Sequence, residues 1–234
     1  MAAVNRLLEE LPRNTRGRFL RQCAQVSLDF GAVLCESDRS YRHVYFPLSG
    51  FISLVAAVGD HPPLEIALIG NEGMLGATLV LGIPQARLQG VVQGTGTALR
   101  MPATRFRREL RSSPALRKLM GRYLYVVLTQ LSRSTVCTRF HQAEPRLARW
   151  LLLTHDRAHA DQFHLTHQYL ADMLGLRRSA VTIAAGTLQR RKLIRYSRGK
   201  IEVLDRSGLE AACCDCYEAA IADYRRIFDL YAVE

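Results

Sequence analysis

Three features of the sequence predict an α+β fold in which a β-rich N-terminal part and a smaller C-terminal unit are joined by a long helix. Ten of the 16 glycines fall in residues 31–101, between short runs rich in Val, Ile, Phe and Tyr. Apolar residues then recur at helical spacing from residue 103 to about 139. Further on, two short helical patterns flank Gly175, and a strand–turn–strand pattern follows them.

The composition fits this organisation. The chain has 234 residues, and a 48% apolar content is enough to fill the cores of one large or two modest domains. No apolar run approaches the roughly 20 residues that a membrane-spanning helix needs. The N-terminal stretch carries acidic residues early, unlike a secretory signal. We therefore expect a cytoplasmic protein without a membrane segment.

Positive charge is concentrated in one part of the chain. The formal net charge is +11, and residues 177–200 hold eight basic residues and no acidic one. Residues 201–234 hold three basic and eight acidic residues, a net charge of −5. This asymmetry favours a polyanionic partner on one face, although a solvated charged surface is the alternative.

Residues 1–30 are expected to be helical, with a break near Pro12. The apolar residues at helix-like spacings are Leu7, Leu8, Leu11, Phe19, Leu20, Cys23 and Val26. From Gly31 to Met101 the pattern changes to short runs such as "RHVYFPLSG" and "LEIALIGNEG", separated by Gly, Pro, Asp and Asn. Many short strands with closely spaced turns predict a β-sandwich or a small β-barrel.

A long helix is predicted from Pro114 to about Arg139, with Ser112 or Ser113 as its N-cap. Its apolar stripe is wider and longer than packing against one small barrel requires. We therefore expect the same helix of a second chain to pack against it as a dimer seam. The residues assigned to this seam are Leu116, Met120, Tyr123, Leu124, Val127 and Leu131.

The two helical patterns around Gly175 predict a helix-turn-helix, because glycine tolerates the positive φ of such a turn. Such helix pairs also occur in proteins that do not bind DNA, but the charge placement favours DNA. A recognition helix presents its N-terminal residues to base edges. The residues assigned to base reading are Arg177, Arg178, Ser179 and Thr182.

The stretch "RKLIRYSRGKIEVLD" predicts two strands with a tight turn at Arg198-Gly199, which would form a wing beside the helix pair. A wing tip of this kind suits contacts to phosphates, which add affinity without sequence information. The residues assigned to phosphate contacts are Thr166, Gln168, Arg198 and Lys200.

The order of these parts, with "LTHQYLADMLGLRRSAVTIAAGTLQRRKLI" followed by a wing, resembles the Crp/Fnr (cyclic-AMP receptor protein/fumarate-nitrate regulator) family of bacterial transcription regulators. The resemblance implies a cyclic-nucleotide-binding-like β-roll (jelly roll) over residues 1–113, a dimerisation helix and hinge over 114–143, and a winged helix-turn-helix domain with a C-terminal helix over 144–234. It also implies a homodimer on a roughly palindromic site in double-stranded DNA, a contact with RNA polymerase, and no enzymatic activity.

The recognition helix departs from the pattern of that family. Only Arg178 carries over as a base-reading residue of the family. Ser179 replaces the usual acidic reader, and Ile183 stands where a later Arg is common. The resemblance therefore implies DNA binding without implying the usual operator sequence of the family.

The resemblance does not extend to a cyclic-AMP pocket. Gly76 is followed by Ala77 where a ribose-binding Glu would stand, and Arg87 is followed by Leu88 instead of a small hydroxyl residue. Arg87 remains the one candidate ligand for another, unknown effector. Cys23 and Cys35 are too few for an N-terminal iron–sulfur cluster. No cofactor is assigned.

Two other groups of residues leave alternatives open. Cys213, Cys214 and Cys216 could bind a metal or sense oxidation, or they could simply be small buried residues. His155 and His159 are spaced as a zinc pair, but no further ligands accompany them, so no metal site is assigned.

Two alternative functions also stay open. One is an effector- or redox-sensing module whose helix-turn-helix docks a protein. The other is a cupin-like metalloenzyme, with only His43 and His61 as barrel histidines.

Overall fold

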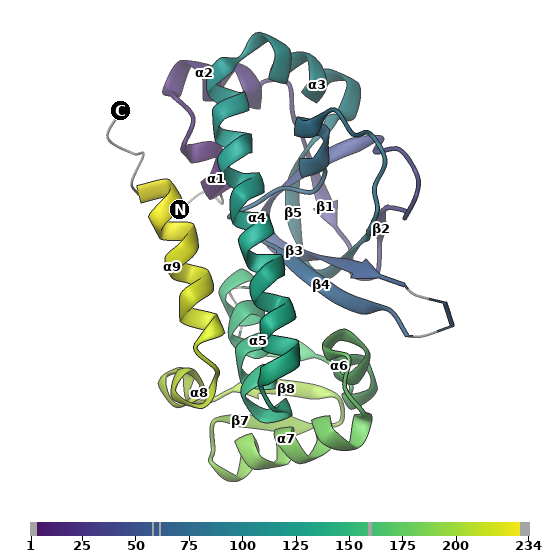
Figure 1. Ribbon diagram of the computed structural model, residues 1–234, viewed down its shortest axis with the longest axis vertical. Helices are drawn as coiled ribbons and strands as arrows, with labels where there is room; N and C mark the ends of the chain where they lie inside the picture. Colours follow the sequence, from purple (N-terminus) through teal and green to yellow (C-terminus); the bar gives the residue numbers. More distant parts are fainter. Residues whose placement is uncertain (1–3, 58, 61, 159–160, 230–234) are drawn as a thin grey trace.

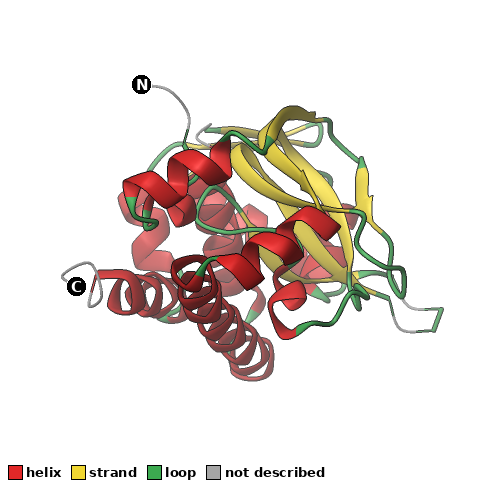
Figure 2. Cartoon of the chain, turned by 90° about the horizontal axis from the view of Figure 1, so that it is seen from above, coloured by secondary structure: helices red, strands yellow, loops and turns green. Residues whose placement is uncertain are grey.

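The computed structural model describes residues 4–57, 59–60, 62–158 and 161–229. A long central helix, α4 (Pro114–Phe140), connects an N-terminal domain built on an antiparallel sheet to a C-terminal helical domain at the other end (Figure 1). Seen from above, the sheet lies on one side of the molecule and most helices lie on the other (Figure 2). This is the α+β architecture that the sequence predicts.

The N-terminal domain contains a five-stranded antiparallel sheet in the order β1-β5-β3-β4, with β2 also paired to β5. The strands are β1 (Ala24–Leu28), β2 (Val33–Cys35), β3 (His43–Ala56), β4 (Leu64–Ile69) and β5 (Gln89–Pro102). The 3-10 helix η1 (Ala77–Leu81) lies between β4 and β5. The two longest strands bend where Gly50 adopts a φ of +69° and the β3–β5 register shifts, which curls the sheet into a roll.

The helical prediction for residues 1–30 is only partly right. Helices α1 (Arg6–Glu9) and α2 (Arg13–Leu20) flank the expected break at Pro12. Residues 24–28, however, form strand β1, whose residues pair with Arg100 to Gly96 of β5. Pairing with a distant strand overrides the local helical spacing of Cys23 and Val26.

Helix α3 (Ala103–Ser112) precedes α4, and Ser113 caps α4 by accepting a hydrogen bond from the backbone N–H of Leu116 at 3.2 Å. Pro114 occupies the first turn, as predicted. The N-terminal half of α4 closes the core of the N-terminal domain, where it joins Phe19, Phe46 and Phe106.

The assignment of Leu116, Met120 and Tyr123 to a dimer seam is wrong. Their side chains are at most 5% exposed within a single chain, because they fill the core beneath α4. The Tyr123 hydroxyl also accepts a hydrogen bond from the Met74 backbone N–H at 3.1 Å. Helical spacing alone does not show whether an apolar stripe faces its own core or a partner.

The C-terminal domain starts with α5 (Ala143–Ala158) and contains the helix pair α6 (His167–Leu174) and α7 (Arg178–Arg190). A three-stranded sheet in the order β6-β8-β7 completes it, with strands β6 (Gln162–His164), β7 (Ile194–Ser197) and β8 (Lys200–Val203). Helices α5, α6 and α7 share one core with this sheet, which includes Leu151, Leu170, Val181, Leu188 and Ile201.

The last two helices connect the domains. Helix α8 (Arg206–Ala212) packs on α5, whereas α9 (Cys216–Asp229) runs back along α4 (Figure 1). Arg133 of α4 pairs with Asp223 of α9 at 2.5 Å, and Phe228 lies in the N-terminal core. Helix α9, which the sequence grouped with the helix-turn-helix domain, packs on both domains, because Tyr217 at its start belongs to the C-terminal core and Phe228 near its end belongs to the N-terminal core.

Candidate nucleic-acid interface

The turn between α6 and α7 has the geometry that Gly175 predicts. Gly175 adopts φ +61° and ψ +43°, the left-handed conformation that ends a helix at glycine. At the other end of α6, Thr166 accepts a hydrogen bond from the Tyr169 backbone N–H at 3.1 Å. Helix α6 is therefore capped at both ends by residues of its own sequence.

The first turn of α7 presents exposed polar side chains. Arg177 is the N-cap residue, and Arg178 and Ser179 follow it on the surface. Among the described residues, no carboxylate forms an ion pair with Arg177 or Arg178. Both guanidinium groups are therefore available to a ligand.

Thr182 lies one turn further along α7, and its hydroxyl is already engaged. Its Oγ1 lies 2.9 Å from Nδ1 of His167 and donates to the carbonyl of Arg178 at 3.0 Å. The His167 ring stacks on Tyr196 of β7, with the ring centroids 4.3 Å apart. This chain of contacts fixes α6, α7 and the wing relative to one another. Burial, together with the charge of Arg178, lowers the pKa of His167 and so favours its neutral form.

The wing forms as predicted. Strands β7 and β8 pair in register from Ile194 with Val203 to Ser197 with Lys200, and Arg198 and Gly199 form the turn with φ values of 48° and 78°. Two successive positive φ values are typical of a tight two-residue hairpin turn. Arg198 and Lys200 are both exposed at this tip.

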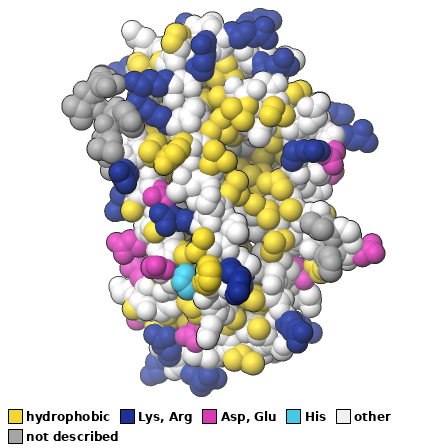
Figure 3. Space-filling model, viewed as in Figure 1, with side chains coloured by type: hydrophobic (Ala, Val, Ile, Leu, Met, Phe, Trp, Pro, Cys, Tyr) yellow, Lys and Arg dark blue, Asp and Glu magenta, His cyan; other side chains and the backbone are white. Residues whose placement is uncertain are grey.

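Other basic residues of the same region are neutralised by acids. Arg195 of β7 pairs with Glu202 of β8 at 2.8 Å, and Arg191 pairs with Glu144 at 3.0 Å. In the described part of the chain, Arg198 and Lys200 have no such carboxylate partner. Figure 3 shows Lys and Arg side chains gathered at the end of the molecule that this domain forms.

The two predicted phosphate-binding residues on α6 have internal partners. The Thr166 hydroxyl caps α6, and the Gln168 side chain donates to Asp172 at 2.8 Å. Both side chains remain exposed. A contact to a ligand would have to use the remaining hydrogen-bonding capacity of these groups.

An apolar stripe follows the outer face of α4. Its members are Tyr125, Leu128, Val136 and Phe140, which are 50–72% exposed. Figure 3 shows hydrophobic side chains gathered on the face of the molecule over this helix. Of the remaining predicted seam residues, Leu124 and Leu131 are half-buried, and Val127 packs against the N-terminal core. The helical spacing of apolar residues in the sequence predicted the helix, but it did not identify the residues of this outer face.

Arg87, the candidate effector ligand, lies on the surface. Its side chain is 82% exposed and pairs with Asp38 at 2.5 Å. The residue therefore does not line an enclosed pocket within one chain.

The structure also brings together four ligand-type side chains, of which the sequence singled out only Cys214 and Cys216. Cys214 and Cys216 meet Cys137 and His141, although no metal site was assigned. Of the histidines considered as zinc ligands, His155 instead lies 2.7 Å from Asp161. His159 and the barrel residue His61 lie outside the described residues.

Comparisons with known proteins agree with this geometry. Residues 145–212 match the model of the Crp-like helix-turn-helix domain. Among curated proteins, no sequence matches the chain. Over the described residues, none of the helices combines the length and the hydropathy that crossing a membrane requires.

Solved structures share the fold of nearly the whole chain. A transcriptional regulator of the Crp/Fnr family from Eubacterium rectale ATCC 33656 is 16% identical, with a TM-score of 0.68 over 88% of this chain and 97% of that one. FixK2 from Bradyrhizobium japonicum is 17% identical, with a TM-score of 0.67 over 82% and 98%. The Crp/Fnr-family regulator TTHA1359 from Thermus thermophilus is 22% identical, with a TM-score of 0.64 over 83% and 98%.

Proposed function

The chain has the fold of the Crp/Fnr transcription regulators and contains a Crp-like helix-turn-helix domain, and from this premise we propose that it is a sequence-specific DNA-binding regulator that acts as a homodimer. The observation that carries the proposal is the placement of exposed basic side chains without carboxylate partners, within the described residues, at the start of α7 and at the wing tip. If the N-terminus of α7 entered the major groove, its basic side chains would face the bases. The basic side chains of the wing tip would then face the DNA backbone.

We assign base reading to the first turns of α7. Arg178 and Arg177 can each donate two hydrogen bonds to a guanine, and Ser179 can contact a base edge or a phosphate. Thr182 can present its methyl group while its hydroxyl is held by His167. Ile183 is 69% exposed on the same helix and would suit the methyl group of a thymine.

The wing and the start of α6 would contact phosphates. Arg198 and Lys200 supply positive charge at the wing tip, and Thr166 and Gln168 supply hydrogen-bonding groups at the start of α6. Such contacts set affinity and register, and they weaken steeply with added salt because counterions are released from the DNA.

A second copy of the chain is the expected partner of the apolar stripe on α4. Tyr125, Leu128, Val136 and Phe140 follow one another at intervals of three, eight and four residues, so they share one helical face. Two such faces packed about a two-fold axis would present two copies of α7 to DNA. The operator would then be roughly palindromic, with half-sites about 34 Å apart along the helix axis.

Cyclic AMP is not the expected effector. Ala77 follows Gly76 where a ribose-binding carboxylate would stand, and Arg87 is exposed and paired with Asp38. We therefore propose a regulator that responds to another signal or to none. The proposal places it in the cytoplasm, where it would act on transcription by RNA polymerase.

Selection of bound sites from random double-stranded DNA tests the proposal. The purified full-length protein, in the presence of reductant, should enrich a palindromic site without cyclic AMP. Affinity for that site should fall steeply with salt. Failure to enrich any site, with weak and salt-independent DNA binding, would contradict the proposal and favour a helix-turn-helix that docks a protein.

A further inference from the structure

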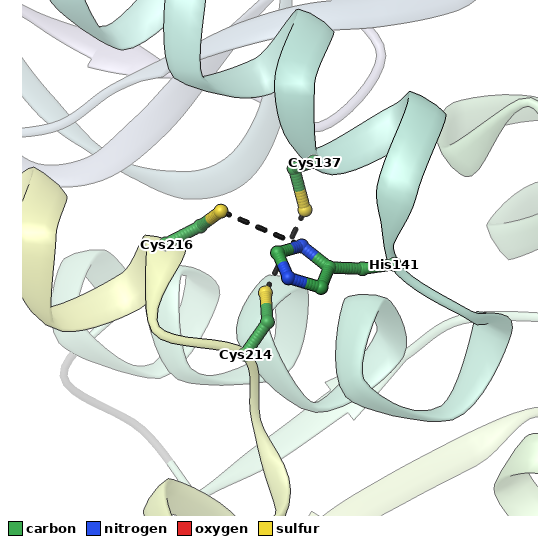
Figure 4. A group of neighbouring side chains, drawn as sticks. All are labelled: Cys137, His141, Cys214 and Cys216. Carbon is green, nitrogen blue, oxygen red and sulfur yellow. Dashed lines mark hydrogen bonds between the residues drawn. The ribbon is translucent and has the colours of Figure 1, made fainter.

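Four side chains that can bind a metal converge where α4 ends and α9 begins. Cys137 belongs to the last turns of α4. His141 is the C-cap residue of the same helix, one helical turn after Cys137. Cys214 and Cys216 come from the junction between α8 and α9. Figure 4 shows the three thiols and the imidazole pointing toward one another. All four candidate ligand atoms lie within 4.8 Å of one another.

The separations fit a single tetrahedral ion. Zinc binds thiolate sulfur at about 2.3 Å and imidazole nitrogen at about 2.0–2.1 Å, which places neighbouring ligands about 3.5–3.8 Å apart. The sulfurs of Cys137 and Cys214 are 3.6 Å apart. The sulfur of Cys216 is likewise 3.6 Å from Nδ1 of His141. A disulfide would require a separation of about 2.05 Å.

The surroundings also suit a bound metal. His141 directs Nδ1 toward the thiols, while its Nε2 lies 3.5 Å from a carboxylate oxygen of Asp215. A carboxylate behind a histidine ligand is a common arrangement, because it fixes the tautomer and the orientation of the ring. The three cysteines are at most 7% exposed and form a small cluster of their own.

Charge balance points the same way. Three thiolates and a neutral imidazole around a divalent ion leave a net charge of −1. The guanidinium of Arg149 on α5 lies near Cys137 and Cys216. Its buried Nε has no hydrogen-bond partner. The site therefore has a cation available to compensate the excess negative charge.

We propose that Cys137, His141, Cys214 and Cys216 bind one zinc ion, which fastens both ends of the helix-turn-helix domain to the end of α4. The domain matched to the Crp-like model, residues 145–212, lies entirely between His141 and Cys214. One ion would thus join the segment just before this domain to the segment just after it. The orientation of α7 relative to α4 would then depend on the metal.

Metal analysis of the full-length protein, purified with reductant, tests the site directly. We expect about one zinc per chain by plasma mass spectrometry. After zinc removal, Co2+ should produce the intense thiolate-to-cobalt absorption of a tetrahedral thiolate site, and Zn2+ should abolish it. A wild-type protein without zinc and without this cobalt absorption would overturn the proposal.

Cys213 provides a matched control beside the site. Its thiol lies outside the group of four and donates to the carbonyl of Glu210 at 3.1 Å. Cys213→Ser should keep the full zinc content, whereas Cys137→Ser and Cys214→Ser should lose at least nine-tenths of it.

His141→Asn alters a half-exposed side chain, so it tests the site even if the buried cysteine variants do not fold. It should bind Co2+ at least tenfold more weakly. Equal zinc loss in Cys213→Ser, or unchanged Co2+ affinity in His141→Asn, would contradict the assignment.

A separate measurement without DNA tests whether zinc stabilises the attachment of the helix-turn-helix domain to α4. Removing zinc with a chelator should lower the Tm of the wild type and of Cys213→Ser, and should lower the Tm of His141→Asn much less, because this variant holds the metal more weakly. An unchanged wild-type Tm after complete zinc loss would overturn this role. Because none of these measurements involves DNA, their outcome is independent of the proposed regulator function.

Discussion

Trp150 of α5 donates its indole N–H to a carboxylate oxygen of Glu65 on β4, with 2.7 Å between Nε1 and Oε1. The other oxygen of Glu65 accepts a hydrogen bond from Ser53 at 2.6 Å. A nearby ion pair joins Arg157 of α5 to Glu72 at 2.7 Å. These contacts hold the helix-turn-helix domain against the N-terminal domain of the same chain.

The Glu65 contact should make stability depend on pH. Burial raises the pKa of Glu65 from 4.5 to about 7, although the hydrogen bonds from Ser53 and Trp150 oppose the shift. The unfolded chain releases this proton near pH 4.5, whereas the folded protein keeps it until about pH 7. The contribution of Glu65 to the free energy of unfolding should therefore be largest below pH 4.5, decrease between about pH 4.5 and 7, and stay constant above that range.

Glu65→Gln isolates this effect, because the amide keeps an oxygen for Trp150 but does not titrate. At pH 8 we expect the variant to be roughly 1–3 kcal/mol more stable than the wild type, since each pH unit of pKa difference is worth about 1.4 kcal/mol. The difference should shrink toward pH 5. Urea unfolding across this range measures it. A gap between the two proteins that does not change with pH would show that Glu65 titrates normally.

The winged helix-turn-helix could be predicted from the sequence because its determinants are local. Gly175 specifies the turn, and Arg198-Gly199 specifies the wing hairpin, each within a few residues. Contacts between distant segments could not be predicted in this way. Strand β1 depends on pairing with β5, and the four ligand-type side chains include Cys137 and Cys214, which are 77 residues apart.

The outer face of α4 should mediate dimerisation. Leu128 is 62% exposed at the middle of this face, and a charge there would be buried by a second copy. Leu128→Glu should shift the protein from dimer to monomer at micromolar concentrations, as measured by light scattering. Phe30 is 60% exposed just after β1 and provides the control, because Phe30→Glu adds the same charge on the sheet side of the molecule. Identical masses for both variants would argue against a seam on this face.

Two variants of the wing with the same loss of charge can test the phosphate contacts. Lys200→Ala and Arg195→Ala each remove one positive charge from the same hairpin. Among the described residues, only Arg195 of these two is paired with a carboxylate, that of Glu202. Lys200→Ala should reduce the slope of log affinity against log salt by about 1. Arg195→Ala should change the slope much less. Fluorescence anisotropy with a labelled duplex between low and physiological salt provides both slopes. Equal changes would mean that general charge, and not the wing tip, sets the affinity.

Arg178 should carry sequence information that Lys200 does not. It is exposed in the first turn of α7 and has no carboxylate partner among the described residues, so its guanidinium can address a guanine edge through two hydrogen bonds. Arg178→Ala should cost about 1–3 kcal/mol on the selected operator and much less on random DNA, and it should relax the preference at one base pair of each half-site. Lys200→Ala should weaken binding to both kinds of DNA by similar factors. Repeating the site selection with both variants measures the preference base by base. If both variants lost the same affinity on operator and random DNA alike, α7 would be contacting the backbone and base reading would have to be assigned elsewhere.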